Sequence, residues 1–179
     1  MIKAIYRNSS YYLGIANLVS NDVEVEAKFD TGAGSTIVTL GAIYDNYKDE
    51  WSETFIAHLK EKYDIATSIF TVASGMDIVA VKVYKNNVIV GDIHFDVFYY
   101  WLSPLSYSKV LLGDDFINNC SFIHNSHSDI IINAFDMAAY TEQHSNNSQK
   151  ILSIDEITDI LSVENSAISL TPCVNMNCF

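Results

Sequence analysis

The residues best suited to chemistry lie in the segment Phe29–Thr36, which reads Phe-Asp-Thr-Gly-Ala-Gly-Ser-Thr. Asp30 is followed at once by small and turn-forming residues, so the segment displays one carboxylate with little side-chain bulk around it. A carboxylate displayed in this way can act as a general acid or base. Gly32 and Gly34 allow positive φ and the close approach of another chain, and the hydroxyl of Thr31 can anchor the turn. The alternative is an ordinary surface turn, because matches of three residues are common by chance.

The flanking residues favour the functional interpretation. In Asp22–Phe29, apolar residues alternate with charged ones, which predicts a strand with one buried face. Ser35–Val38 predicts a second strand directly after the turn. The acid is therefore expected between two core strands and not in a solvated loop.

Most of the remaining chain also alternates with the period of a strand. Asn86-Asn87 is a turn signal between two of these strands, and Asp114–Asn119 predicts a brief helix. Further strands are predicted at Ile2–Arg7, Tyr11–Leu18, Thr67–Ala73, Asp77–Lys85, Val88–Val90, Ile93–Tyr99, Val110–Leu112, Phe122-Ile123 and Ile130–Ile132.

One long segment has the period of a helix. Apolar residues recur every four positions across Asp49–Tyr63, with Glu and Lys between them. Asp49 is the expected helix cap, and the acids that follow it suit the first turn of a helix.

Three motifs in this order resemble the retropepsin family, the retroviral-type aspartic proteases and their bacterial relatives. The first is the apolar-Asp-Thr-Gly-Ala turn, Phe29–Ala33. The second is Thr71–Gly75 (Thr-Val-Ala-Ser-Gly), which is similar to the tip of the family's flap, the hairpin that closes over the substrate. The third is Val110–Ile117, which is similar to the family's apolar-apolar-Gly motif and its short helix.

The resemblance implies a role for each matched residue. Asp30 would be the catalytic carboxylate. Thr31 would bond across to a partner chain, and Gly32 and Ala33 would contact the substrate. The flap residues would be Ala73, Ser74 and Gly75, and the residues supporting the turn from below would be Leu111, Leu112 and Gly113.

The family's chemistry needs two carboxylates, and this chain has only Asp30 in the required setting. A two-fold homodimer would supply the second one. Two carboxylates held close together do not both ionise easily, so the pair would share one proton. No metal or cofactor is required. The predicted partners are therefore a polypeptide substrate and a second copy of the chain.

Two positions depart from the family pattern. Many members have an acid after the Asp-Thr-Gly-Ala stretch and an Arg after the later Gly, and these two residues pair. Here Gly34 and Asp114 occupy those positions. The pair is absent, and the flap tip contains only one glycine, Gly75.

Composition excludes several other classes of protein. The chain has 179 residues, 49% of them hydrophobic, and a formal net charge of −12. Such an acidic surface disfavours nucleic acid and anionic lipid. The N-terminus has no apolar core of signal-peptide length. Cys120, Cys173 and Cys178 form neither a disulfide framework nor a zinc motif, so a cytoplasmic location is expected.

Other candidate sites have weaker patterns. His124 and His127 could ligate a metal but fit a polar hairpin better. The aromatic run Phe98–Trp101 is typical of core packing, although part of it could line a substrate cleft. No phosphate loop or dinucleotide motif is present.

The composition shifts after Ala139. Thr141–Lys150 has the polar composition of a linker, and Ser153–Glu156 has the spacing of a helix capping box. We therefore expect a protease-like domain over residues 1–139, and a linker, short helix and tail over residues 140–179. The helix could pack on its own barrel or on a partner, or could cover the cleft.

These features together predict an all-β, acid-protease-like closed barrel with one inserted helix and a C-terminal helical tail. The predicted function is that of a homodimeric aspartic endopeptidase. Two alternatives stay open: a retropepsin-like dimerisation or peptide-binding module without turnover, and a structural protein that uses the barrel for assembly.

Overall fold

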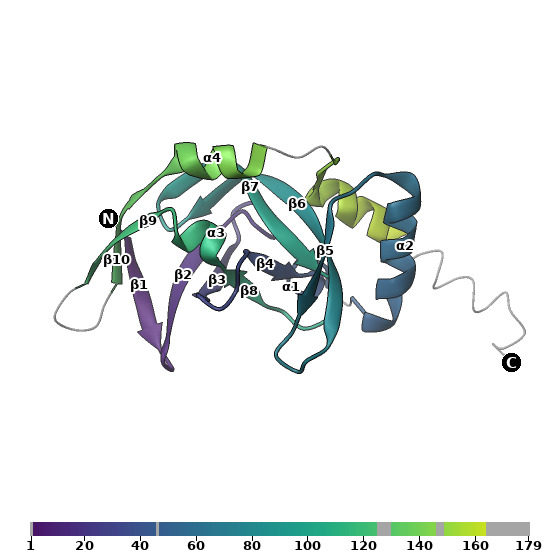
Figure 1. Cartoon of the computed structure of the whole chain (residues 1–179), viewed down its shortest axis with the longest axis horizontal. Helices are drawn as coiled ribbons and strands as arrows, with labels where there is room; N and C mark the ends of the chain where they lie inside the picture. The colour runs from purple at the N-terminus through teal and green to yellow at the C-terminus, as the bar shows by residue number, and fades with distance from the viewer. Residues whose placement is uncertain (1, 46, 125–129, 146–148, 164–179) are drawn as a thin grey trace, which may run out of the picture.

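The computed structural model describes residues 2–45, 47–124, 130–145 and 149–163 (Figure 1). The strands are β1 (Ile2–Arg7), β2 (Ser10–Ala16), β3 (Glu24–Phe29), β4 (Ile37–Thr39), β5 (Thr67–Thr71), β6 (Asp77–Val90), β7 (Ile93–Ser103), β8 (Val110–Leu112), β9 (Cys120–His124), β10 (Ile130–Phe135) and β11 (Leu152–Ser153). The helices are α1 (Leu40–Ile43), the 3-10 helix η1 (Asp49–Trp51), α2 (Ser52–Lys62), α3 (Asp114–Ile117), α4 (Met137–Ser145) and a last helix over residues 154–163. The prediction of a mainly β chain is confirmed.

The strands join in the order β11-β6-β7-β4-β8-β3-β2-β1-β10-β9, and β5 pairs with β6. β2 also pairs with β6, so the pairings from β6 to β2 return to their starting strand. The β2–β6, β3–β8 and β4–β8 junctions consist of only two residue pairs each. A closed barrel therefore stays a prediction, although the ring of pairings is compatible with it.

The predicted turn at Asn86-Asn87 is wrong, because β6 runs through both residues. Its antiparallel pairing with β7 keeps one register from Val81 to Val90. Asn87 adopts a left-handed backbone conformation with φ of 59° inside the strand, and its carbonyl oxygen accepts a hydrogen bond from the Asn17 side chain. The chain reverses instead at Gly91, where φ is 63°. Pairing with a long partner strand outweighs the local turn propensity of two asparagines.

The predicted helix over Asp49–Tyr63 is confirmed as η1 followed by α2. Phe55, Ile56 and Leu59 form its buried side. Asp49 does not cap the helix, because its carboxylate accepts a hydrogen bond from the Ser106 backbone N–H at 2.7 Å. This bond ties the start of the helical segment to the loop that follows β7.

The C-terminal part of the described chain packs on the same core as the strands. The polar stretch predicted as a linker is helical in its first half, where it forms the end of α4. β11 then pairs in parallel with β6. The Ser153 hydroxyl accepts a hydrogen bond from the Glu156 N–H at 3.1 Å, as the capping-box spacing predicts. Leu152, Ile157 and Leu161 are fully buried in the core.

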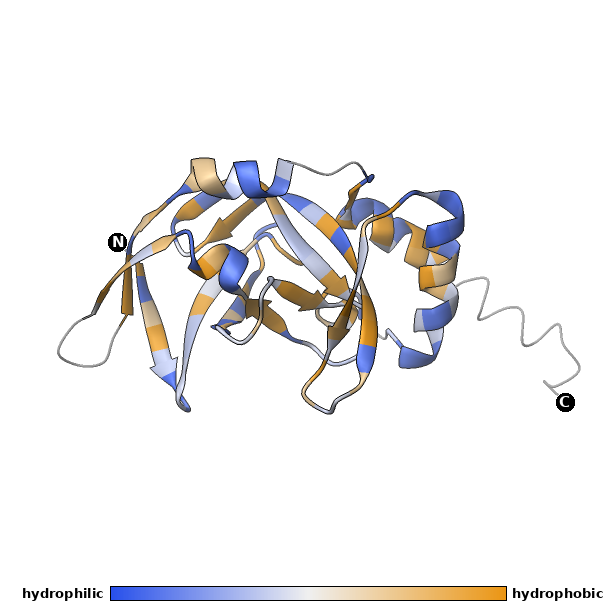
Figure 2. Cartoon of the chain, in the orientation of Figure 1, coloured by the Kyte–Doolittle hydropathy of each residue, from blue (hydrophilic) through white to orange (hydrophobic). Residues whose placement is uncertain are grey.

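The predicted boundary between residues 139 and 140 falls inside α4, and residues on both sides of it share one core. Figure 1 shows the last helix lying between the strands and α2. Apolar residues are concentrated on the central strands, whereas α2 carries hydrophilic residues along its outer side (Figure 2). None of the helices in the described ranges is both long and apolar enough to cross a bilayer.

Candidate active site

Asp30 lies at the first position of a tight turn between β3 and β4. The Asp30 N–H donates to the carbonyl oxygen of Leu112 at 2.9 Å, and the Asp30 carbonyl oxygen accepts from the Ala33 N–H at 3.1 Å. One carboxylate oxygen accepts a hydrogen bond from the Gly32 N–H at 2.9 Å. In the described part of the chain, the other oxygen accepts none. The carboxylate is thus held in place but is still able to bind a further group.

β8 supports the turn from below. It lies between β3 and β4, parallel to the first and antiparallel to the second. The Asp114 N–H donates to the Ala33 carbonyl oxygen at 2.8 Å, which ties the end of β8 to the turn. A Cβ atom at Gly113 would lie 2.3 Å from the Ser35 carbonyl oxygen, so only glycine fits at this crossing. Leu111, Leu112 and Gly113 therefore lie next to the turn.

Gly32 and Gly34 differ from the expectation for turn glycines. Neither adopts positive φ, since the described glycines that do so are Gly75 and Gly91. A Cβ atom at Gly32 would lie 3.1 Å from the Asp30 carboxylate, whereas one at Gly34 would meet no atom within 4 Å. Gly32 therefore leaves room beside the carboxylate, and Gly34 faces open space.

A second carboxylate, Asp115, lies at the start of α3 and is buried, with only 7% of its surface exposed. One of its oxygens accepts three hydrogen bonds: from the Thr36 N–H at 2.9 Å, from the Thr36 hydroxyl at 2.7 Å and from the Phe116 N–H at 2.9 Å. The Thr36 hydroxyl in turn accepts the Gly113 N–H at 3.2 Å. Burial raises the pKa of Asp115, and the hydrogen bonds from Thr36 partly oppose that rise.

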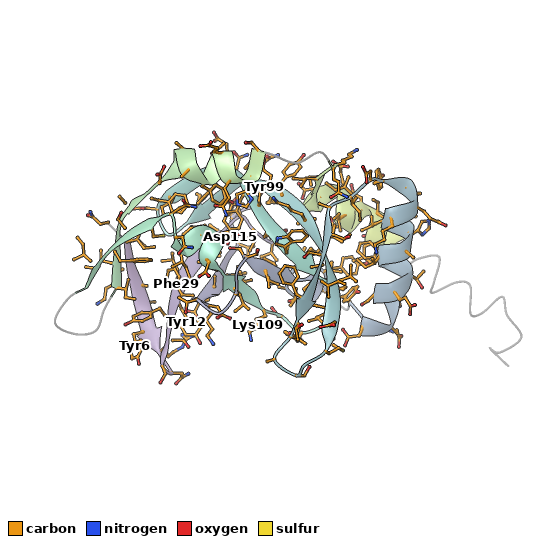
Figure 3. All side chains as sticks on the ribbon, in the orientation of Figure 1. Tyr6, Tyr12, Phe29, Tyr99, Lys109 and Asp115 are labelled. Carbon is orange, nitrogen blue, oxygen red and sulfur yellow. The ribbon has the colours of Figure 1, made fainter. Side chains whose placement is uncertain are left out.

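Asp115 therefore anchors α3 to the strand that follows the turn. Figure 3 shows it in the middle of the molecule. Sequence reasoning included Asp115 in the third motif but gave it no role and missed this one. Asp114 and Asp115 are adjacent acids, and no local pattern distinguishes the buried one from its half-exposed neighbour.

A cavity of about 270 Å³ separates the turn from the β5–β6 hairpin. Asp30, Gly32 and Ala33 line it on one side, and Ala73 lines it from the hairpin; Leu111 also contributes. Lys109, which sequence reasoning did not single out, lies at its rim and at the lower edge of the molecule in Figure 3. The structure thus brings the first, second and third motifs to one hollow.

The hairpin over this cavity has a defined tip. The Val72 N–H donates to the Met76 carbonyl oxygen at 2.9 Å, and the Gly75 N–H donates to the Val72 carbonyl oxygen at 2.8 Å. Gly75 adopts a φ of 86°, which explains why glycine is required there. Ser74 and Gly75 are exposed and do not line the cavity, unlike Ala73. The tip is therefore accessible to solvent.

Thr31 lies on another side of the turn. It lines a separate groove with Phe29, Ile117, Phe122 and Ile130, and is itself exposed. The groove is bounded by the β1–β2 hairpin and β10. Thr31 therefore faces a surface on which apolar side chains gather, and not the cavity that Asp30 lines.

A cluster of titratable groups lies apart from the turn, beneath α4. His144 is buried and stacks on the ring of Tyr99 at 4.9 Å. Burial and the nearby Lys82 ammonium lower the pKa of His144 to about 4. Burial also lowers the pKa of Lys82, whose ammonium lies 5.7 Å from the centre of the Tyr99 ring. The aromatic run Phe98–Trp101 thus packs in and around the core, as its pattern indicates.

The remaining sequence candidates are the histidine pair and the cysteines. His127 lies outside the described residues, as do Cys173 and Cys178, and the side chain of His124 is not described either. Cys120 is half-buried with a free thiol. Burial raises the pKa of this thiol to about 12, so it is poorly suited to act as a nucleophile.

Comparison with known proteins gives likenesses among solved structures alone. No protein-family model matches the chain. No curated protein matches it. Among solved structures, the chain is similar to the crystal structure of a retropepsin-like aspartic protease from Rickettsia conorii. The match has 19% sequence identity and a TM-score of 0.46, and covers 74% of this chain and 97% of that chain. A likeness at this level assigns neither an activity nor a set of site residues.

Proposed function

We propose that this protein is an aspartic endopeptidase that acts as a homodimer. The observation that carries the proposal is the setting of Asp30. Its carboxylate lines a cavity between a hydrogen-bonded turn and the tip of a hairpin, and one of its oxygens is not engaged by any described residue. A module that only binds peptides would have no need of such an acid.

In the proposed mechanism, each subunit contributes one Asp30 to a pair that shares one proton. The ionised carboxylate removes a proton from a bound water, whose oxygen attacks the carbonyl carbon of the peptide bond. The protonated carboxylate donates its proton to the carbonyl oxygen, which gives a neutral tetrahedral intermediate. Transfer of a proton to the amide nitrogen breaks the C–N bond and releases both products. Neither a metal nor a cofactor takes part.

The fold supplies surfaces that suit the proposed dimer. β9 ends the order of strands, so one of its edges is unpaired among the described strands, and unpaired edges are ready sites for pairing with another chain. Ile5 and Tyr6 on β1 and Ile123 on β9 are exposed. Thr31 lies on the same side of the turn as the groove beside β1–β2 and β10. We assign this side of the molecule to the two-fold interface, with Thr31 reaching across it.

The other site residues take the following roles in the proposal. Gly32 and Ala33 contact the substrate backbone in the cavity, and Ala73, Ser74 and Gly75 form the part of the hairpin that closes over it. Leu111, Leu112 and Gly113 hold the turn in place. Substitution of the family's charged pair by Gly34 and Asp114 leaves the turn intact, because the backbone bond between Asp114 and Ala33 is still made.

The proposal is tested with denatured casein between about pH 4 and pH 7, the range in which a shared proton can be held. Wild type and Asp30→Asn are assayed side by side, with and without pepstatin, and sedimentation gives the number of chains per particle. We expect cleavage by the wild type alone and two chains per particle. Equal cleavage by both proteins would identify a contaminant, and no cleavage by a dimer would favour the peptide-binding module.

A further inference from the structure

A second hollow, larger than the cavity at Asp30, lies between α2 and the β5–β6 hairpin. We call it the helix groove. Its volume is about 720 Å³, within the range of pockets that bind small ligands. Residues of α2 line one side of it, and residues of the hairpin line the other. The residues that line it from the hairpin are Met76, Asp77, Ile78 and Val79.

The helix groove adjoins the cavity at Asp30. Ile78 and Leu105 line both hollows, so the two share a wall. An extended chain that crosses the turn under the hairpin can therefore continue along α2 without leaving the surface. Because extended chains advance about 3.3 Å per residue, a few further residues are enough to enter the groove.

The side of the groove formed by α2 is fixed to the rest of the molecule. The Ser52 hydroxyl donates to the Pro104 carbonyl oxygen at 2.8 Å and also bonds to the hydroxyl of Tyr47 at 2.5 Å. Asp49 accepts the Ser106 N–H at 2.7 Å. These contacts hold the start of α2 against the loop after β7, so the groove is formed before a ligand arrives.

The chemistry of the groove is apolar inside and acidic around the rim. Ile56, Ile78 and Leu105 are among its apolar side chains. Its charged groups are three carboxylates, from Asp49, Glu53 and Asp77, and one ammonium, from Lys60. Asp77 is oriented by a hydrogen bond from the Thr71 hydroxyl at 2.7 Å, and Glu53 is exposed. The formal charge of the whole chain, −12, has the same sign as the rim.

We propose that the helix groove binds the part of the polypeptide substrate that extends beyond the cleaved bond, and that it selects an apolar side chain flanked by Lys or Arg. This inference rests on the proposed function for its occupant. The apolar residue fills the interior, and the basic residue pairs with the carboxylates of the rim. The protein is thus specific for basic, apolar segments at a distance from Asp30.

The test measures binding without cleavage. The Asp30→Asn variant is titrated into a fluorescein-labelled peptide that has a Leu-Phe centre and two lysines at one end. A twin peptide carries two glutamates in place of the lysines. We expect the lysine peptide to bind about tenfold more tightly, as two charge pairs of moderate strength predict. Equal affinity for the two peptides would overturn the proposal.

Two substitutions, made in the Asp30→Asn background, locate the binding site. Glu53→Lys reverses one charge of the rim, and we expect it to weaken binding of the lysine peptide about three- to fivefold. Glu50→Lys is the matched control, because Glu50 is acidic, exposed and at the same end of the helix but does not line the groove. Ala57→Trp fills the groove, and we expect it to weaken binding about tenfold. Similar losses in the control and in Glu53→Lys would contradict the proposal.

The outcomes separate this inference from the proposed function. Binding of the lysine peptide with no cleavage by the wild type would refute the peptidase and leave the groove assignment standing. Cleavage by the wild type, with equal affinity for the two peptides, would support the peptidase and refute the groove assignment. Loss of the dimer in Ala57→Trp, seen by sedimentation, would assign the groove to a second copy of the chain and overturn the proposal.

Discussion

The turn at Asp30 and the start of α3 at Asp115 each display a carboxylate, but the two carboxylates have opposite surroundings. Asp115 is 7% exposed, and one of its oxygens accepts three hydrogen bonds. Asp30 is half-exposed, accepts one hydrogen bond from Gly32 and lines a cavity. The two groups lie on neighbouring segments that are joined through Thr36 and Gly113.

The difference distinguishes a carboxylate that stabilises the fold from one that can take part in catalysis. A buried carboxylate with several donors stabilises its neighbours but has no access to a substrate. A half-exposed carboxylate on a rigid turn can exchange a proton with a bound molecule. Asp115 is therefore a positioning residue, and Asp30 is the catalytic candidate.

The largest expected effect is the loss of activity in Asp30→Asn. Removing the general base should lower the rate of casein cleavage about a thousandfold or more. The fold should be unaffected, because an asparagine oxygen can still accept the Gly32 N–H. A thermal melt within about 2 °C of the wild type, measured beside the activity assay, is the expected control. A variant that unfolds would place Asp30 among the structural residues instead.

At Asp115, by contrast, substitution is expected to lower the stability of the fold. Asp115→Leu removes the acceptor for three buried donors and should lower the free energy of unfolding by about 2–4 kcal/mol. Asp115→Asn keeps an acceptor, so urea denaturation should show a change within about 1 kcal/mol.

The pH dependence of stability gives a second test of the role of Asp115. Because burial raises the pKa of Asp115 above 3.8, its ionisation costs stability as the pH rises past that value. The Asn variant should therefore lose less stability than the wild type between low pH and neutral pH. Identical pH profiles for the two proteins would show that Asp115 ionises without cost.

The glycines beside the two carboxylates should also differ. Gly113→Ala places a Cβ atom 2.3 Å from the Ser35 carbonyl oxygen and should cost about 1–3 kcal/mol. Gly34→Ala meets no atom within 4 Å and should change stability by less than about 0.5 kcal/mol. Chemical denaturation of both variants measures the difference. Equal losses would mean that the crossing of β8 beneath the turn is looser than the structure shows.

The last prediction concerns His144, which is buried on α4. Its folded-state pKa of about 4 lies below the ordinary value of 6.5, so the stability it contributes is fully present above pH 6.5. That stability should fall by about 1–2 kcal/mol as the pH drops towards 4, with allowance for screening by solvent. His144→Phe should remove this part of the pH dependence in thermal melts. A profile that keeps its slope in the variant would assign the dependence to other groups.

Sequence patterns predicted the elements around Asp30 well. Alternation of apolar and charged residues identified β3, and apolar residues at every fourth position identified α2. Both patterns are clear because one face of each element is apolar and the other is polar. The three motifs also lie around one cavity in the structure. Local patterning is informative wherever one element buries one face.

Contacts between distant segments could not be predicted in the same way. The burial of Asp115 depends on Thr36, 79 residues away in the chain. β6 continues through Asn87 because β7 pairs with it, and α4 forms over a polar stretch because Tyr140 and His144 are buried. In each case the tertiary environment outweighs local composition.

The central claim is that two chains contribute one Asp30 each to a shared site, and subunit mixing tests it most directly. Wild type and Asp30→Asn are mixed in equal amounts, allowed to exchange subunits, and assayed at a constant total concentration. If both carboxylates are needed, only wild-type pairs cleave, and activity should fall to about a quarter of that of pure wild type. Activity of about one half, the value for chains that act independently, would contradict the shared site.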